Sequence, residues 1–340
     1  MPSHLTPGPP PENHPTVAAA DPLAGLVGGP EATGTQHRLV RGAAEAVVVG
    51  LAAALRTYRV DGVDLVEPYG PDQIPPAGNG IQMSPWPNRV AGGRWTLDGA
   101  EQQLDITEPA RGNASHGLLR NTHLVAEERQ EHAVTLRGEI HPQHGWPFRM
   151  THRVRYELAE DGGLTVTMSL TNLTDRPAPA AFGAHPFLRL GQVPSDQLRL
   201  RVDAAERVLT GEDLIPTGTG PVEGTEDDFR SGRVLGAGAR DVALTGLVPD
   251  ADGLHRAHLV APDGRSVTLW SEPAFAWTHV FVTDRLPQRP TAVAVEPLTA
   301  PANALNTGEG LAWLEPGHTL TARWGITAHL TTHSTKETGA

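Results

Sequence analysis

Two segments in the middle of the chain, Arg149-Met-Thr-His-Arg-Val-Arg-Tyr156 and Leu164-Thr-Val-Thr-Met-Ser-Leu170, decide the fold class. Apolar and polar residues alternate in both, which is the period of a β-strand with one buried face. Between them lies Asp161-Gly-Gly163, and Gly and Asp accept the positive φ that a tight hairpin turn demands. The two segments therefore predict an antiparallel β-hairpin.

The same pattern continues on both sides of this hairpin. Further short β-rich runs are Ala46-Val-Val-Val49, Leu55-Arg-Thr-Tyr-Arg-Val60 and Val134-Thr-Leu-Arg137, and further turn signals are Asp61-Gly62, Asp252-Gly253 and Asp263-Gly264. No segment carries a helical apolar stripe longer than two turns, and no repeat of fixed period is present. We therefore predict an all-β fold, a large antiparallel β-sandwich, in a single domain over residues 35–331.

Both ends of the chain differ from this pattern. Residues 1–34 contain eight prolines and many Gly and Ala residues, a composition that buries too little apolar surface to offset the entropy of ordering. We expect a disordered tail there and a second flexible tail over residues 332–340.

The overall composition excludes several classes of protein. Gly and Pro supply 37 and 31 of the 340 residues, and there is no cysteine, which argues against a helical bundle and a disulfide scaffold. The net charge of −12, with scattered basic residues, argues against nucleic-acid binding. The longest apolar stretch is too short to span a membrane, and the N-terminus lacks the basic start of a signal peptide, so we expect a cytoplasmic protein that does not bind membranes.

The chain offers no convincing set of metal ligands. His141-Pro-Gln-His144 has a two-residue gap that could suit a metal, but the chain has no thiolate and Pro142 stiffens the spacing. Histidines in loops are far more often free of metal. We therefore predict neither a metal nor a cofactor.

Two segments suggest a site for a small polar ligand. Counting by two places His185 on one face with Ala181, Gly183 and Phe187, and it places Glu296 on one face with Ala292 and Ala294, while Val293 and Val295 point into a core. An imidazole and a carboxylate, each beside small residues, would leave open space above the sheet for a ligand. Sheets also alternate small and large residues simply to pack, and a strand-end Glu can face water, so each residue alone has an equally good structural explanation.

Further elements join these two segments in a fixed order along the chain. The order is Gln82-Met-Ser-Pro-Trp86-Pro87-Asn88-Arg89, Gly92-Gly93, Leu97-Asp98-Gly99, His116-Gly117, Gly145-Trp-Pro-Phe148, Asn172, His185-Pro186-Phe187, Gly224-Thr225, Asp228-Phe229-Arg230, Asp241, Glu296-Pro297, Leu314-Glu-Pro-Gly317 and Trp324. Each element alone is weak, but together they resemble the aldose 1-epimerase (mutarotase) family over residues 36–330.

This resemblance implies a galactose mutarotase-like β-supersandwich that holds a free sugar, a small molecule, in a solvent-facing groove, as a monomer or homodimer. His185 matches the general acid and Glu296 the general base of the family. Arg89, His116 and Asp241 match sugar-binding positions, Asn88 belongs to the same motif, and Trp86 or Phe187 could stack on the sugar. The chain departs from the family pattern at Phe187, Asn303 and His279, where Tyr, Asp and Gln are common; these departures bear on sugar preference.

The implied reaction interconverts the α and β anomers of an aldohexose. A base removes the proton of the C1 hydroxyl, an acid protonates the ring oxygen, and the two groups are expected on opposite sides of the hemiacetal. Three alternatives stay open. A glycosidase could use Asp241 and Glu296 as paired carboxylates, a non-catalytic sugar-binding protein could share the fold, and a hexose-6-phosphate 1-epimerase would need further arginines near the far end of the sugar.

Overall fold

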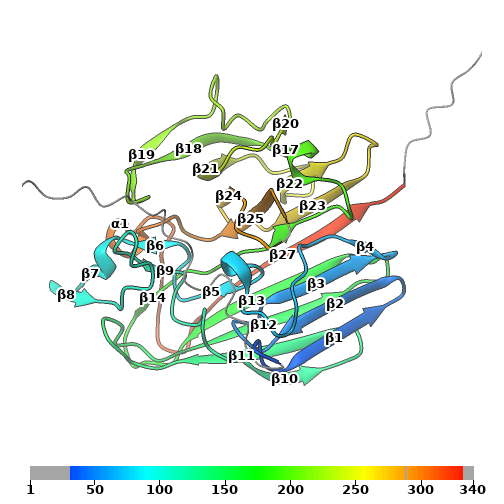
Figure 1. The fold of residues 1–340 in the computed structure, drawn as a ribbon. Helices are drawn as coiled ribbons and strands as arrows, with labels where there is room; N and C mark the ends of the chain where they lie inside the picture. Colours follow the sequence, from blue (N-terminus) through cyan, green and yellow to red (C-terminus); the bar gives the residue numbers. More distant parts are fainter. Residues whose placement is uncertain (1–30, 288, 332–340) are drawn as a thin grey trace, which may run out of the picture.

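The computed structural model describes residues 31–287 and 289–331. Within these residues the regular structure is nearly all β-strand, in three large sheets and three two-stranded ribbons (Figure 1). The helical segments there are short: α1 (Ala304–Thr307) and the single turns η1 (Pro76–Gly78), η2 (Ala91–Gly93) and η3 (Ser195–Gln197). The all-β prediction is confirmed, and no helix in this part of the chain is long and apolar enough to cross a membrane.

The largest sheet has nine strands and contains the predicted hairpin. Its order is β10 (Val125–Arg129), β11 (Ala133–Ile140), β12 (Met150–Leu158), β13 (Leu164–Asn172), β27 (Thr319–His329), β23 (Ser266–Ser271), β22 (His255–Val260), β17 (Arg199–Val202) and β20 (Arg233–Val234). The hairpin joins β12 and β13 in antiparallel register, with Leu158 opposite Leu164. Gly162 adopts φ +87° in the turn, a conformation that glycine takes without steric cost.

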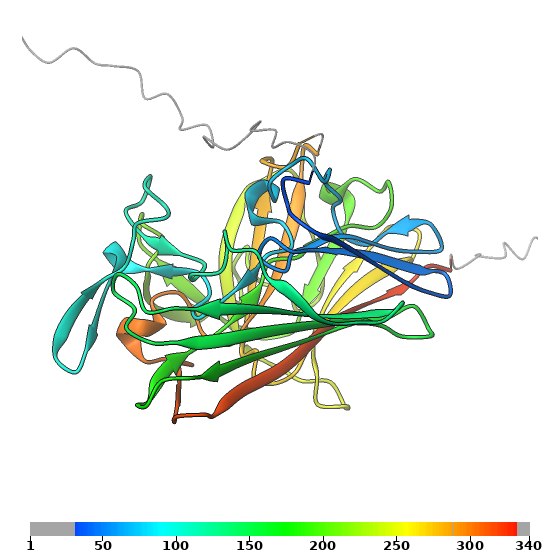
Figure 2. The ribbon, with the colours of Figure 1, turned by 90° about the horizontal axis from the view of Figure 1, so that it is seen from below.

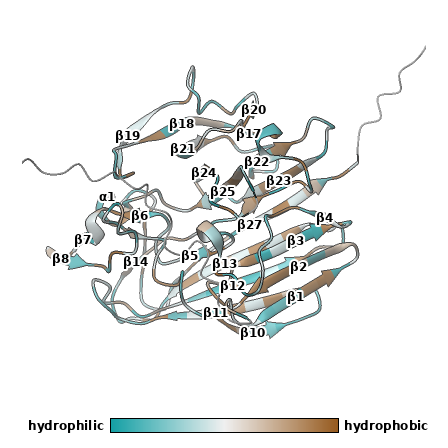
Figure 3. Ribbon diagram, in the orientation of Figure 1, coloured by the Kyte–Doolittle hydropathy of each residue, from teal (hydrophilic) through white to brown (hydrophobic). Residues whose placement is uncertain are grey.

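A four-stranded sheet lies against one end of this large sheet. It consists of β1 (Gln36–Arg41), β2 (Ala44–Val49), β3 (Leu55–Val60) and β4 (Val63–Asp64), and these strands cross over the green strands in Figure 2. The second half of β2, which ends in three valines, is strongly apolar (Figure 3). Buried tyrosines tie the two sheets together, because the Tyr156 hydroxyl donates to the Ala53 carbonyl at 2.7 Å and the Tyr58 hydroxyl to the Gly162 carbonyl.

An eight-stranded sheet forms the other half of the sandwich, in the upper part of Figure 1. Its order is β19 (Pro216–Pro221), β18 (Ala204–Thr210), β21 (Arg240–Leu247), β24 (Trp277–Thr283), β25 (Ala292–Leu298), β15 (Gly183–Ala184) and β5 (Gln82–Met83), and β16 (Phe187–Leu188) pairs with β25 as well. Val293 and Val295 of β25 point into the main apolar core, as predicted, whereas Ala292 and Ala294 belong to a separate small cluster on the opposite face.

Three short ribbons lie beside one end of the sheets, together with α1 (Figure 1). They are β6 (Arg89–Val90) with β9 (Ala114–Ser115), β7 (Arg94–Leu97) with β8 (Ala100–Gln103), and β14 (Ala178–Ala180) with β26 (Ala312–Leu314). An aromatic cluster of the core anchors this region: the Trp146 ring lies 5.5 Å from Trp86, 5.8 Å from Trp95 and 5.3 Å from Phe148 between ring centroids.

Most of the predicted tails fall outside the described residues, namely 1–30 and 332–340. Residues 31–34, which the sequence predicts as part of the tail, form a turn. Thr33 is fully buried there, and its carbonyl accepts a hydrogen bond from the Leu51 amide at 2.9 Å. These four residues are therefore part of the folded structure.

His152 of β12 makes the stability of the protein sensitive to acid. Its side chain is fully buried beside Phe182, and burial lowers its pKa to about 4. An unfolded histidine binds a proton near pH 6.5. The folded state is therefore disfavoured as the pH falls from about 6.5 to about 4, by up to about 3 kcal/mol.

We predict that His152→Phe removes this loss, because phenylalanine keeps the ring and has no proton to bind. The free energy of unfolding, measured with urea at pH 7 and pH 4.5, should fall less with acid in the variant than in the wild type. Equal losses in the two proteins would show that His152 does not contribute.

Candidate active site

Three neighbouring strands of the eight-stranded sheet carry two acidic residues and one histidine of the site. Glu296 lies on β25 directly opposite His279 of β24, and Asp241 lies on β21 opposite Phe281 of β24. Residues opposite each other, or two apart on one strand, share a face of the sheet. Glu296, His279 and Asp241 therefore come together on one face.

His185 reaches the same face from the segment between β15 and β16. Its backbone amide donates to the Ile81 carbonyl, and the Val295 amide donates to the Pro186 carbonyl, so the segment runs along β25. The His185 Nε2 atom lies 3.3 Å from the Glu296 Oε1 atom, and the two side chains are 5% and 2% exposed. The structure thus brings the predicted acid and the predicted base into direct contact.

The Phe187 ring packs on one face of the His185 ring. The two rings are stacked, with centroids 5.3 Å apart and planes at 27°. Phe187 is fully buried and packs on Ala292 and Ala294. The alanines share a face with Glu296 as predicted, but the Phe187 ring fills the space above them. The prediction of open space for a ligand at these positions is therefore wrong. A buried Phe187 also has no exposed ring surface on which a sugar could stack.

Trp86 is also placed differently from the prediction. Its side chain is 2% exposed and packs on Trp146 in the main core. Stacking on a sugar needs an accessible ring face, so the alternative of core packing describes Trp86. Phe281, by contrast, is only partly buried, and its ring meets His185 and Phe187 edge-on at 6.2 Å.

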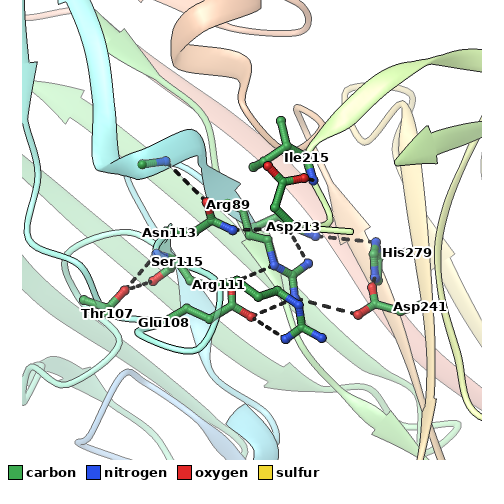
Figure 4. Close-up of polar contacts among 12 residues, drawn as sticks. Arg89, Thr107, Glu108, Arg111, Asn113, Ser115, Asp213, Ile215, Asp241 and His279 are labelled. Atoms are coloured by element: carbon green, nitrogen blue, oxygen red, sulfur yellow. Dashed lines mark hydrogen bonds and ion pairs between the residues drawn. The ribbon is translucent and has the colours of Figure 1, made fainter. Parts of the chain in front are cut away.

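The remaining predicted residues come from the β6–β9 ribbon, where Arg89 pairs with Ser115. Arg89 donates from Nε and Nη2 to Glu108 at 2.8 and 3.2 Å and from Nη1 to Asn88 at 3.2 Å. Its Nη2 atom also lies 3.7 Å from Asp241, and Figure 4 shows the guanidinium between these two carboxylates. Glu108, which the sequence did not reveal, therefore orients Arg89 toward the site.

His116 completes the group beside His185. Its ring meets the His185 ring edge-on at 5.5 Å, and its backbone amide donates to the Asn88 carbonyl at 2.8 Å. Gly117 follows with φ +71°, and a Cβ atom there would lie 2.1 Å from the Ser84 carbonyl oxygen. This close approach explains why a glycine follows the histidine in the sequence.

The electrostatic environment distinguishes the three histidines of the site. Burial lowers the pKa of His185, against the raising effect of Glu296, and burial with the nearby His185 holds the pKa of His116 well below its ordinary value. Burial would also lower the pKa of His279, but Glu296 and Asp241 outweigh it and raise that pKa. His279 is therefore the site histidine that most readily carries a positive charge.

Asp241 is tightly held. Burial alone would raise its pKa, but the hydrogen bond and charge of His279, together with Arg89, hold it well below its usual range. The sequence indicated His279 only as a departure from a family pattern, and the structure adds it to the site as the partner of Asp241, with Nε2 and Oδ1 2.8 Å apart.

Several buried polar atoms of the site make no hydrogen bond within the described residues. They are Glu296 Oε2, His185 Nδ1 and His116 Nδ1. Buried polar atoms normally have partners, so this group of atoms fits a polar ligand. Among residues 31–287 and 289–331 no group of three or more His, Cys, Asp or Glu side chains is arranged to hold a metal ion.

Comparisons with known proteins identify the family of the chain. The family model of aldose 1-epimerase matches residues 36–327. YihR of Escherichia coli K12, described as an uncharacterized protein, is 30% identical over 286 residues, which cover 84% of this chain and 90% of YihR.

Solved structures are similar over most of the chain. The GalM/aldose epimerase homologue from C. elegans has a TM-score of 0.76 at 18% identity and covers 87% of this chain and 98% of that one. Galactose 1-epimerase from Lactobacillus acidophilus has a TM-score of 0.72 at 17% identity, with 86% and 93% covered. The fold is thus an antiparallel β-sandwich of the galactose mutarotase-like type. Because the family model matches most of the sequence as well, the chain belongs to the aldose 1-epimerase family.

Proposed function

We propose that this protein is an aldose 1-epimerase that interconverts the anomers of a free aldohexose. The observation that supports this most directly is the contact between His185 Nε2 and Glu296 Oε1 at 3.3 Å. Proton transfer by such positioned side chains is the chemistry of ring opening. Glu296 removes the proton of the C1 hydroxyl, His185 protonates the ring oxygen, and the C1–O5 bond breaks to give the aldehyde.

The second half of the reaction reverses these steps on the other face of the carbonyl. After rotation about C1–C2, the C5 hydroxyl returns its proton to His185 and attacks C1, while Glu296 gives its proton to the carbonyl oxygen. Both reacting oxygens are bonded to C1, so an acid and a base 3.3 Å apart can address them side by side. We therefore propose this arrangement in place of groups on opposite sides of the hemiacetal.

The test is anomer exchange on freshly dissolved sugars. Polarimetry or proton NMR, with and without the protein, should show faster exchange on at least one of glucose and galactose. Glucose 6-phosphate tests the alternative of a hexose-phosphate epimerase, and a chromogenic glycoside tests the alternative of a glycosidase. Sugar binding without any acceleration would favour the non-catalytic alternative.

Arg89, His116 and Asp241 are proposed to bind the sugar hydroxyls. For Arg89, three of its N–H groups are directed at Glu108 and Asn88. A guanidinium has five such groups, and the second one on Nη2 lies on the side of Asp241, at 3.7 Å, so one on Nη1 is left for a ligand. Charge-assisted hydrogen bonds of this kind contribute in the ground state and the transition state alike.

Arg89→Ala is predicted to raise KM by about 10- to 100-fold, with a smaller effect on kcat. His116→Ala and Asp241→Ala should show the same tendency. Steady-state rates of anomer exchange over a range of sugar concentrations give both constants. A loss confined to kcat would contradict the assignment of these residues to ground-state binding.

A further inference from the structure

His279 occupies a position in the site that the proposed mechanism does not yet use. It lies opposite Glu296 in the β24–β25 pair, and its side chain is 8% exposed. The Nε2 atom lies 2.8 Å from Asp241 Oδ1, and Figure 4 shows the imidazole directed at that carboxylate. Asp241 thus fixes the orientation of the ring and the role of one ring nitrogen.

The second nitrogen, Nδ1, is where a proton can be gained or lost. It lies 3.5 Å from Asn88 Nδ2, at the limit of a hydrogen bond. The other end of the Asn88 amide accepts from Arg89 Nη1, which keeps the NH₂ group facing the ring. In the neutral ring Nδ1 accepts this long hydrogen bond, whereas the protonated Nδ1 faces the NH₂ group as a second donor, an opposition that the neighbouring carboxylates outweigh.

The charges around His279 come from several elements. They are Asp241 of β21, Glu296 of β25, Arg89 of β6, and the imidazoles of His185 and His116. The two carboxylates favour a charged ring and Arg89 opposes it, with the net result that the pKa of His279 is raised.

Glu296 needs a nearby positive charge in order to act as a base. Its side chain is 2% exposed and its Oε2 atom has no hydrogen-bond partner among the described residues, and burying an ionised carboxylate without compensation is costly. Burial lowers the pKa of His185, so that histidine carries a positive charge beside Glu296 only at lower pH. His279 makes no direct proton transfer and keeps its charge.

We propose that His279 is a positioning residue which, as an imidazolium held by Asp241, keeps the Glu296 carboxylate ionised. This rests on the proposed function, in which Glu296 is the base. Because the coupling between two charged sites is reciprocal, the stabilisation that Glu296 gives to the charged His279 is matched by an equal stabilisation of the Glu296 carboxylate. Asp241 then both binds the sugar and holds His279.

The kinetic test uses His279→Gln, which keeps a hydrogen-bonding side chain and removes the charge. The acidic limb of the kcat/KM profile should move to higher pH by about one pH unit, because the Glu296 carboxylate loses the neighbouring positive charge. His258→Gln is the matched control, because His258 lies in β22 of the other sheet and bonds Thr268. An acidic limb that coincides with that of the wild type would overturn the proposal.

A second measurement separates this proposal from the proposed function. The titration of His279 is followed by NMR, with its signal assigned by its absence in His279→Gln. Its pKa should lie above the ordinary histidine value of about 6.5 and fall in both Glu296→Gln and Asp241→Asn. If the wild type exchanges no anomers, the proposed function fails. The NMR titrations still decide whether Glu296 raises the pKa of His279. A His279 pKa that is the same in Glu296→Gln as in the wild type would overturn the proposal.

Discussion

Glu296→Gln is expected to slow anomer exchange by about 10²- to 10⁴-fold, which is the usual contribution of a positioned general base and corresponds to about 3 to 5 kcal/mol of barrier. Glutamine keeps the shape of the side chain and an oxygen that can face His185 Nε2, so the contact at 3.3 Å can persist. It cannot take a proton from the C1 hydroxyl. The variant should therefore fold normally and still bind sugar.

The measurement combines proton NMR of anomer exchange, thermal unfolding and calorimetric sugar binding. Glu45→Gln serves as the matched control, because it is the same chemical change at a residue away from the site. Glu45 pairs with Arg38 on the four-stranded sheet. The acidic limb of the rate profile should flatten in Glu296→Gln alone. Full activity in Glu296→Gln would contradict the acid–base mechanism and would favour the alternative of a non-catalytic sugar-binding protein.

The local part of the fold could be predicted because each signal is carried by neighbouring residues. The hairpin over Met150–Leu158 and Leu164–Asn172 needs only alternation of period two and a turn with positive φ at Gly162. The pairing of β13 with β27 is different: it joins Leu164 to Ile326. Several strands share the same alternating pattern, and nothing in a short segment specifies which of them becomes its neighbour.

The site shows the same division. Period-two counting correctly separated Glu296 and the alanines of β25 from the core-facing valines, since the sides of one strand are a local property. The stacking role suggested for Trp86 was wrong, because an aromatic residue in a motif has the same sequence signature whether its ring is accessible or packed on Trp146. His279 and Asp241 lie 38 residues apart and meet only through the pairing of β21 with β24.

His185→Asn is expected to be as damaging as the change at Glu296, with a loss of about 10²- to 10⁴-fold. Asparagine is polar and smaller than histidine, so it fits the space of the ring, but its amide cannot protonate a ring oxygen. The structure also specifies the pH dependence. Burial lowers the pKa of His185, so the acid form is lost as the pH rises past a value below that of an ordinary histidine.

The alkaline limb of the wild-type profile should therefore begin on the acidic side of about pH 6.5, and it should disappear in His185→Asn while the acidic limb remains. This pattern is the mirror image of that in Glu296→Gln, and proton NMR of anomer exchange between pH 4 and 9 distinguishes the two. His258→Asn is the control for the same substitution on the other sheet. If His185→Asn kept both its rate and its alkaline limb, the proton donor would have to be another group. His279 would then be the first to test, because it is the site histidine whose pKa is raised.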